Sequence, residues 1–192
     1  HNNHPEVIGT MGQVPKENIT LIETEEDAQT VEVTNPNQLA FATQTTLSVD
    51  DTNAILTILK NRFPNIKGPT AEDICYATTN RQEAVKSLAK ICDCILVIGA
   101  ENSSNSLRLV EVALSNGVKN SFLIPHERAL DDFLNTYDPI QFPNIGLTAG
   151  ASAPETLVQA LIEKLKTNFN VNEINNEVIK ENITFNLPKI LR

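Results

Sequence analysis

The chain has no tryptophan, and aromatic residues make up only 5% of its 192 residues. Basic residues are also scarce, since 15 lysines and arginines stand against 24 aspartates and glutamates, for a formal net charge of -9. Attraction to nucleic-acid phosphates or to an anionic membrane surface needs a basic face, so this charge argues against both partners. An anionic ligand would have to be held by local groups.

Long apolar runs are missing as well. No stretch approaches the roughly 20 apolar residues that a membrane span requires, and no basic segment followed by an apolar one opens the sequence. The three cysteines are an odd number, too few for a disulfide scaffold, and fit a reducing compartment. These absences predict a cytoplasmic protein.

The chain does contain a repeated alternation of strand and helix patterns. The segment CILVIG, over 94–99, is short, apolar and closed by a glycine, which is typical of a strand buried on both faces of a parallel sheet. The residues after it, up to Gly117, carry their apolar side chains at helical spacing. The sequence predicts an α/β fold with right-handed crossovers, in which further strands lie over 121–124 and 145–149 and further helices over 80–92, 127–134 and 154–169.

A domain boundary is expected over 63–69, where two prolines and a glycine interrupt the helical patterns on both sides. Before it, we expect strands over 19–22 and 39–43 and helices over 24–31 and 49–63, with Thr24 and Ser48 as N-cap residues. The predicted division is an α/β domain over 1–70, another over 71–169, and a tail over 170–192 with a short strand over 183–187.

Small polar residues gather where predicted strands run into helices. The run NSSNS over 102–106 follows one strand, and Ser152 follows another. A helix N-terminus has unpaired N–H groups and a positive dipole end, so such turns can hold an anion. An ordinary N-cap explains one or two of these residues but not five in a row. The carboxyl ends of parallel strands lie at one edge of the sheet, where ligands bind. The turn that holds Thr45 would also lie at this edge if the first domain faces it.

Neither G-x-x-x-x-G-K-[ST] nor G-x-G-x-x-G occurs, so we expect a small phosphorylated metabolite rather than a nucleotide. His4 and Glu6 flank a proline and belong either to a solvated terminus or to a reactive site. Cys75 is either a small core residue or a thiolate at a helix N-terminus. For Cys92 and Cys94, packing is favoured over metal binding.

Five segments of the chain, in order, resemble the 4-hydroxy-3-methylbut-2-enyl diphosphate reductases: HPEVIGTMGQ over 4–13, TQTTLSVDD over 43–51, DICYATTNRQEAV over 73–85, NSSNS over 102–106 and TAGASAP over 148–154. These are iron-sulfur enzymes of the non-mevalonate isoprenoid pathway. The resemblance covers residues 4 to about 187. It implies three α/β domains around a central cluster, of which this chain would hold the second, truncated at its N-terminus, and the third.

The resemblance implies reductive removal of the substrate's hydroxyl to give isopentenyl and dimethylallyl diphosphate, with electrons from a ferredoxin or flavodoxin. It implies that Cys75 is one of three cysteine ligands of a 4Fe-4S cluster, that Glu6 delivers protons, and that Thr45 binds close to the leaving hydroxyl. The residues implied in diphosphate binding are His4, Ser103, Ser104, Asn105 and Ser152.

In this family the other two cluster cysteines belong to sequence upstream of His1, and neither Cys92 nor Cys94 matches a ligand position. We therefore expect that these 192 residues alone complete no cluster and do not reduce the substrate. The alternative that the residues leave open is a cluster-free module that binds a small phosphorylated metabolite without chemistry.

Overall fold

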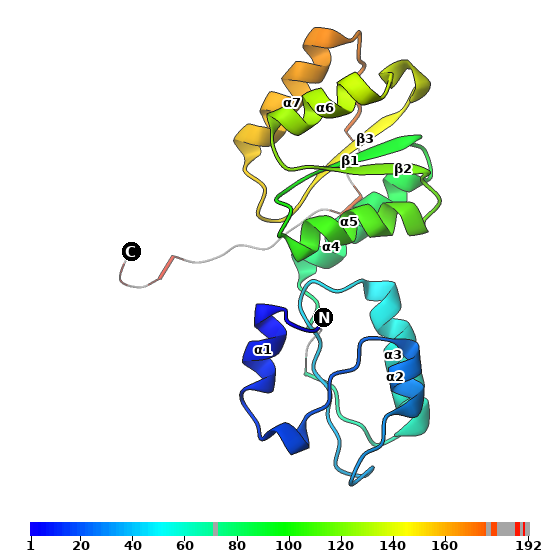
Figure 1. Cartoon of the computed structure of the whole chain (residues 1–192), viewed down its shortest axis with the longest axis vertical. Helices are drawn as coiled ribbons and strands as arrows, with labels where there is room; N and C mark the ends of the chain where they lie inside the picture. Colours follow the sequence, from blue (N-terminus) through cyan, green and yellow to red (C-terminus); the bar gives the residue numbers. More distant parts are fainter. Residues whose placement is uncertain (71–72, 176–177, 180–186, 189, 191–192) are drawn as a thin grey trace.

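A computed structural model describes residues 1–70, 73–175, 178–179, 187–188 and 190. Its elements form two parts that follow each other along the long axis of the molecule, one with α1 to α3 and one with the sheet and α4 to α7 (Figure 1). In the part of the chain so described, no helix is both long and apolar enough to cross a membrane.

The sheet consists of three parallel strands in the order β2-β1-β3, namely β1 (Cys94–Ile98), β2 (Asn120–Ile124) and β3 (Ile145–Ala149). The central strand β1 is buried at all five positions, as its apolar run predicts, and Leu96 pairs with Phe122 on one side and Leu147 on the other. The predicted α/β fold with a parallel sheet is confirmed.

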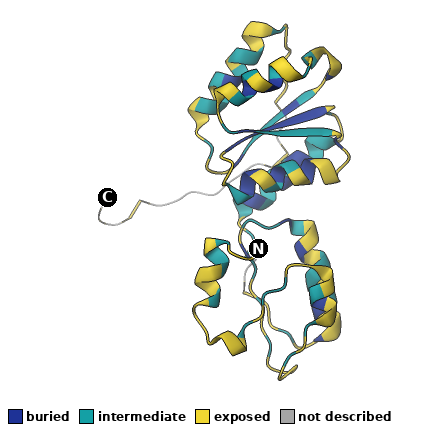
Figure 2. Ribbon diagram, in the orientation of Figure 1, coloured by how far each residue is buried: buried dark blue, intermediate teal, exposed yellow. Residues whose placement is uncertain are grey.

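Helices cover both faces of this sheet (Figure 1). Ile95 and Val97 point into a core shared with α4 (Tyr76–Ala89) and α5 (Ser104–Ser115). The alternate residues Leu96 and Ile98 belong to a second core with residues of α6 (Glu127–Thr136) and α7 (Glu155–Asn168) and with Phe142, which follows the short 3-10 turn η2 (Pro139–Gln141). Figure 2 shows the result, with the buried central strand β1 between helices that are exposed on their outer sides.

The first part contains α1 (Pro5–Met11), a 3-10 turn η1 (Lys16–Asn18), α2 (Glu25–Thr30) and α3 (Val49–Arg62). Its core is small and lies between α2 and α3, around Ala28, Leu59 and Phe63. The Arg62 guanidinium donates to the carbonyls of Ala28 (2.6 Å) and Val31 (2.8 Å), so the end of α3 holds the end of α2. Thr24 and Ser48 are the N-cap residues of the two helices, as predicted.

The strands predicted over 19–22 and 39–43 are wrong for the described residues. Leu39 and Phe41 form backbone hydrogen bonds only with Lys67, at 2.9 Å each, and Ala40 and Lys67 make an isolated parallel bridge. The segment 19–22 has no backbone partner in the described chain. A β-strand forms only when a second extended segment pairs with it through backbone hydrogen bonds. An apolar run can indicate an extended segment, but it does not show whether a partner segment lies beside it.

Two helix starts also differ from the prediction. The helix expected from Asn80 begins at Tyr76, which makes Cys75 its N-cap residue. Pro154, expected at the first helical position of α7, is instead the N-cap, because its backbone is extended (ψ 131°). The strand predicted over 183–187 lies outside the described residues, except for Leu187.

Candidate functional site

The structure brings together three predicted site residues that are far apart in the sequence. One oxygen of the Glu6 carboxylate accepts a hydrogen bond from the Thr45 backbone N–H (3.0 Å), and the other accepts from the Thr45 hydroxyl (3.1 Å). The Thr45 carbonyl in turn accepts from the backbone N–H of Cys75 (3.0 Å). A carboxylic acid, a hydroxyl and a thiol therefore share one region.

The local sequence explains how Glu6 is held. His4 is the N-cap of α1, and its Nδ1 accepts from the backbone N–H of Glu6 (3.3 Å), while Pro5 supplies a fixed φ at the first helical position. When Nδ1 accepts, a neutral imidazole carries its proton on Nε2. The Nε2 of His4 is then a hydrogen-bond donor.

Cys75 is exposed at the start of α4, and its sulfur makes no cap hydrogen bond. It lines a cavity of about 420 Å³ together with Ile74, Tyr76, Thr79 and Asn80. Among the described residues no group of three histidine, cysteine or acidic side chains is placed to hold a metal.

The other two cysteines are core residues. Cys94 is fully buried, and burial, with smaller contributions from Cys92 and Asp93, raises the pKa of its thiol to about 12. Burial and then the charge of Asp93 also raise the pKa of Cys92. Both remain protonated thiols at neutral pH and are packed, as the sequence indicated. Cys92 lies so close to Gly146 that a side chain on this β3 residue would meet its sulfur at 3.0 Å.

The predicted anion-binding turn is the start of α5. Ser103 is the N-cap, and its hydroxyl oxygen accepts from the backbone N–H (3.3 Å) and the hydroxyl (3.0 Å) of Ser106. Ser104 is the first helical residue and is half-buried. The Asn105 side chain is only 6% exposed, yet neither its Nδ2 nor its Oδ1 has a hydrogen-bond partner among the described residues. A buried amide left unpaired in this way costs about 1–3 kcal/mol.

Two glycines let this turn sit directly on the ends of the strands. A β-carbon on Gly99, after β1, would lie 2.0 Å from the hydroxyl of Ser106, and one on Gly150, after β3, would lie 2.2 Å from it. The Gly150 β-carbon position is also 3.7 Å from Nδ2 of Asn105. The turn that holds Ser152, which is exposed, therefore begins beside the unpaired amide.

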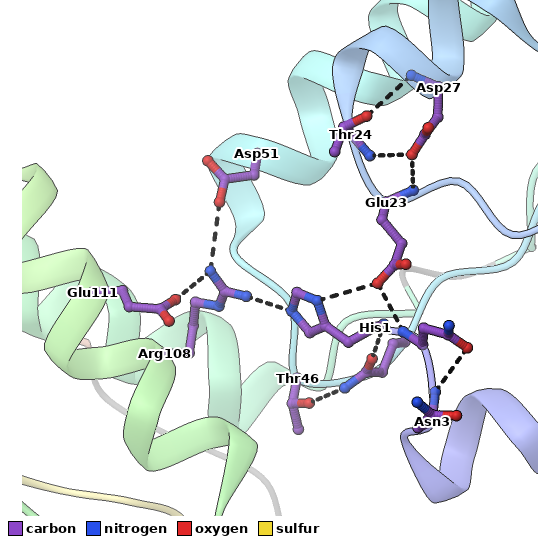
Figure 3. A network of polar contacts seen from close by, with 11 residues as sticks. His1, Asn3, Glu23, Thr24, Asp27, Thr46, Asp51, Arg108 and Glu111 are labelled. Carbon is purple, nitrogen blue, oxygen red and sulfur yellow. Dashed lines mark hydrogen bonds and ion pairs between the residues drawn. The ribbon is translucent and has the colours of Figure 1, made fainter.

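In the described chain, no hydrogen bond connects this turn directly to Glu6, Thr45 or Cys75. The turn at the start of α5 and the group of Glu6, Thr45 and Cys75 are connected through further residues that the sequence did not indicate. Arg108 of α5 lies 3.6 Å from Asp51 of α3 and donates to the ring of His1 (2.7 Å), whose backbone nitrogen donates to Gln44 (2.9 Å), as Figure 3 shows in part. These partners are dozens of residues apart, and no local pattern marks them.

Comparisons with known proteins agree on one family. The family model described as "LytB protein" matches residues 1–166. A 4-hydroxy-3-methylbut-2-enyl diphosphate reductase of Roseobacter denitrificans is 50% identical over 192 residues, covering 100% of this chain and 60% of the relative. One of Hyphomonas neptunium is 52% identical over 191 residues, covering 100% and 59%.

Among solved structures, the chain is similar to the E-1-hydroxy-2-methyl-but-2-enyl-4-diphosphate reductase from Plasmodium falciparum. The TM-score is 0.86 at 32% sequence identity, and the match covers 100% of this chain and 59% of that one. The chain thus spans about three fifths of the length of these relatives.

Proposed function

This chain belongs to the LytB protein family, and from that premise we propose that it supplies the proton-donating and diphosphate-binding residues of a 4-hydroxy-3-methylbut-2-enyl diphosphate reductase. The reaction would break the bond between carbon and the substrate's hydroxyl and give isopentenyl and dimethylallyl diphosphate. The similarity to the two bacterial 4-hydroxy-3-methylbut-2-enyl diphosphate reductases supports this reaction.

The observation that carries the proposal is the unpaired amide of Asn105. A diphosphate at the start of α5 would accept from Nδ2 and from the free N–H groups of the first helical turn. The Ser103 hydroxyl already accepts two hydrogen bonds, so its own proton is available to the same anion. Ser104, Ser152 and His4 are the remaining proposed diphosphate ligands. Because the chain carries a net charge of -9, attraction for this anion has to come from these local donors.

Glu6 is proposed as the proton donor. Hydroxide is a poor leaving group, so the oxygen must be protonated as its bond to carbon breaks, and it then departs as water. Thr45 fixes both oxygens of the Glu6 carboxyl group, and it is held in turn by the backbone N–H of Cys75. The Glu6 carboxyl group is thereby linked through Thr45 to the backbone of Cys75.

Cys75 is proposed as one ligand of a 4Fe-4S cluster. The bound cluster would supply a Lewis acid for the hydroxyl and pass on two electrons, one at a time, from a ferredoxin or flavodoxin. Cys94 is a buried residue of the core on one face of the sheet, and Cys92 packs against the core on the other face, so the remaining ligands would come from outside these residues. An exposed thiol of this kind suits a reducing compartment such as the cytoplasm.

The test is a calorimetric titration of the 192-residue chain with pyrophosphate, comparing the wild type with Asn105→Leu. The substitution keeps the side-chain shape but removes a charge-assisted hydrogen bond worth about 1.5–3 kcal/mol, so the affinity should fall by roughly 10- to 150-fold. Urea stability should not fall, because an unpaired buried amide is being removed.

Asn168→Leu is the matched control, since Asn168 is exposed near the end of α7. It should bind pyrophosphate as the wild type does. If the wild type does not bind pyrophosphate, or if Asn105→Leu binds it equally well, the diphosphate assignment is wrong.

A further inference from the structure

Helix α4 contacts both halves of the proposed site. At its start the Cys75 backbone N–H donates to the Thr45 carbonyl (3.0 Å). Nearly two turns later the Arg81 guanidinium donates through Nε to the carbonyl of Ala149 (3.2 Å), the last residue of β3, directly before the turn that holds Ser152. This helix is therefore the element against which the two halves are aligned.

The next residue, Gln82, faces the other way and binds the Thr45 segment. Its side chain is only 1% exposed. Nε2 donates to the Leu47 carbonyl (2.8 Å), and Oε1 accepts from the Val49 backbone N–H (3.0 Å). Val49 is the first residue of α3, so its N–H is one of the donors that the helix itself leaves unpaired. The buried side-chain amide of Gln82 thus forms hydrogen bonds with the backbone on both sides of the N-cap Ser48.

Three ion pairs lie beside this contact. Lys86 binds Asp50 (2.9 Å) and Glu83 (3.0 Å), and Arg108 lies 3.6 Å from Asp51. Partial burial lowers the pKa of Lys86, but its hydrogen bonds with the two carboxylates outweigh this and raise the pKa above its ordinary value.

The two aspartates are 62% and 72% exposed, and ion pairs with exposed partners contribute little to stability. The buried amide of Gln82, whose loss would leave two backbone groups unpaired, contributes more.

We propose that Gln82 is the positioning residue for Thr45. It fixes the backbone two and four residues after Thr45 onto α4, while Cys75 fixes Thr45 itself, so that the segment 45–49 has one register against the helix. Glu6, which is bound to Thr45 by two hydrogen bonds, is positioned through the same contact. The inference rests on the proposed function, in which Thr45 and Glu6 act on the leaving hydroxyl.

The test is amide hydrogen exchange in the 192-residue chain with Gln82→Met, which keeps the length of the side chain and removes both hydrogen bonds. Protection of the Val49 N–H should fall by at least about tenfold, and that of the Thr45 N–H should fall with it, while protection of Leu96 in β1 stays unchanged. A role confined to general stability would instead lower all three alike.

Gln82→Glu provides a second, pH-dependent readout. A protonated carboxyl offers the same donor and acceptor as the amide, and burial favours the protonated form, so protection of Val49 should return at about pH 5 and be lost at about pH 8. Gln159→Met on exposed α7 is the matched control and should change none of these amides.

Pyrophosphate titration separates this inference from the proposed function. Because α5 is seated on the sheet through Ser106, Gln82→Met should bind pyrophosphate within about twofold of the wild type. If the wild type does not bind pyrophosphate, this result contradicts the proposed diphosphate-binding function but not the positioning role of Gln82. Unchanged protection of Thr45 and Val49 in Gln82→Met, or an equal loss at Leu96, would overturn the positioning role.

Discussion

The glycines that follow β1 and β3 allow a quantitative test of how α5 is seated. A β-carbon on Gly99 would lie 2.0 Å from the Ser106 hydroxyl oxygen and 2.7 Å from its β-carbon, whereas one on Gly150 would lie 2.2 Å and 3.4 Å from the same atoms. Optimal contacts between carbon atoms are about 3.5–4.0 Å, so alanine at either position must displace the Ser106 side chain at the start of α5. We expect each substitution to cost about 1–3 kcal/mol of unfolding free energy.

Ser106→Ala distinguishes the two positions. It removes the hydroxyl, along with a hydrogen bond to Ser103 that is worth about 1 kcal/mol. With the hydroxyl gone, the methyl group of Gly150→Ala meets only a β-carbon at 3.4 Å, which is close to ordinary contact, whereas that of Gly99→Ala still meets one at 2.7 Å. Most of the cost of Gly150→Ala should therefore disappear in the double variant, and the cost of Gly99→Ala should remain.

Urea unfolding followed by circular dichroism measures these free energies. Gly9→Ala is the control, because a β-carbon on this α1 residue meets nothing within 4 Å, and alanine should stabilise the helix by up to about 1 kcal/mol. A neutral Gly150→Ala, or a Ser106→Ala variant that rescues both glycine substitutions equally, would refute this account of the turn.

Two further predictions follow from titratable groups. A hydrogen bond from the backbone of Glu23, with others from Thr24, lowers the pKa of Asp27, so its contribution to stability is present above pH 3.8 and is lost as the pH falls through the lower folded value. Acid titration of Asp27→Asn by circular dichroism should lack that step, and an unchanged titration would contradict it. In thiol labelling at neutral pH, exposed Cys75 should react fast, while buried Cys94, with its pKa of about 12, should react only on unfolding. A fast phase that survives Cys75→Ser would be inconsistent with this assignment.

Features that depend on neighbouring residues could be predicted from the sequence. The apolar run of β1 identified the central buried strand, and the hydroxyls of Thr24 and Ser48 identified two N-caps, because a cap binds the backbone three residues away. The unusual cluster over 102–106 marked the turn where Asn105 is buried without a partner.

Features that depend on distant partners could not be predicted in this way. The segments 19–22 and 39–43 have strand-like patterns, but strand formation requires a neighbour that no periodicity reveals. Gln82 reads as an ordinary polar residue on a helix, and its role follows only from Leu47 and Val49, more than thirty positions earlier. The resemblance of the five segments named the family and the expected site residues, but not the contacts that hold those residues in place.

The most direct test of the central claim is turnover of 4-hydroxy-3-methylbut-2-enyl diphosphate by an active reductase that contains these 192 residues, with Glu6 replaced by Gln. If Glu6 donates the proton, kcat should fall by about 10²- to 10⁴-fold while substrate affinity stays nearly unchanged. Normal turnover accompanied by a strong loss of affinity would show instead that Glu6 serves binding and that another group protonates the leaving hydroxyl.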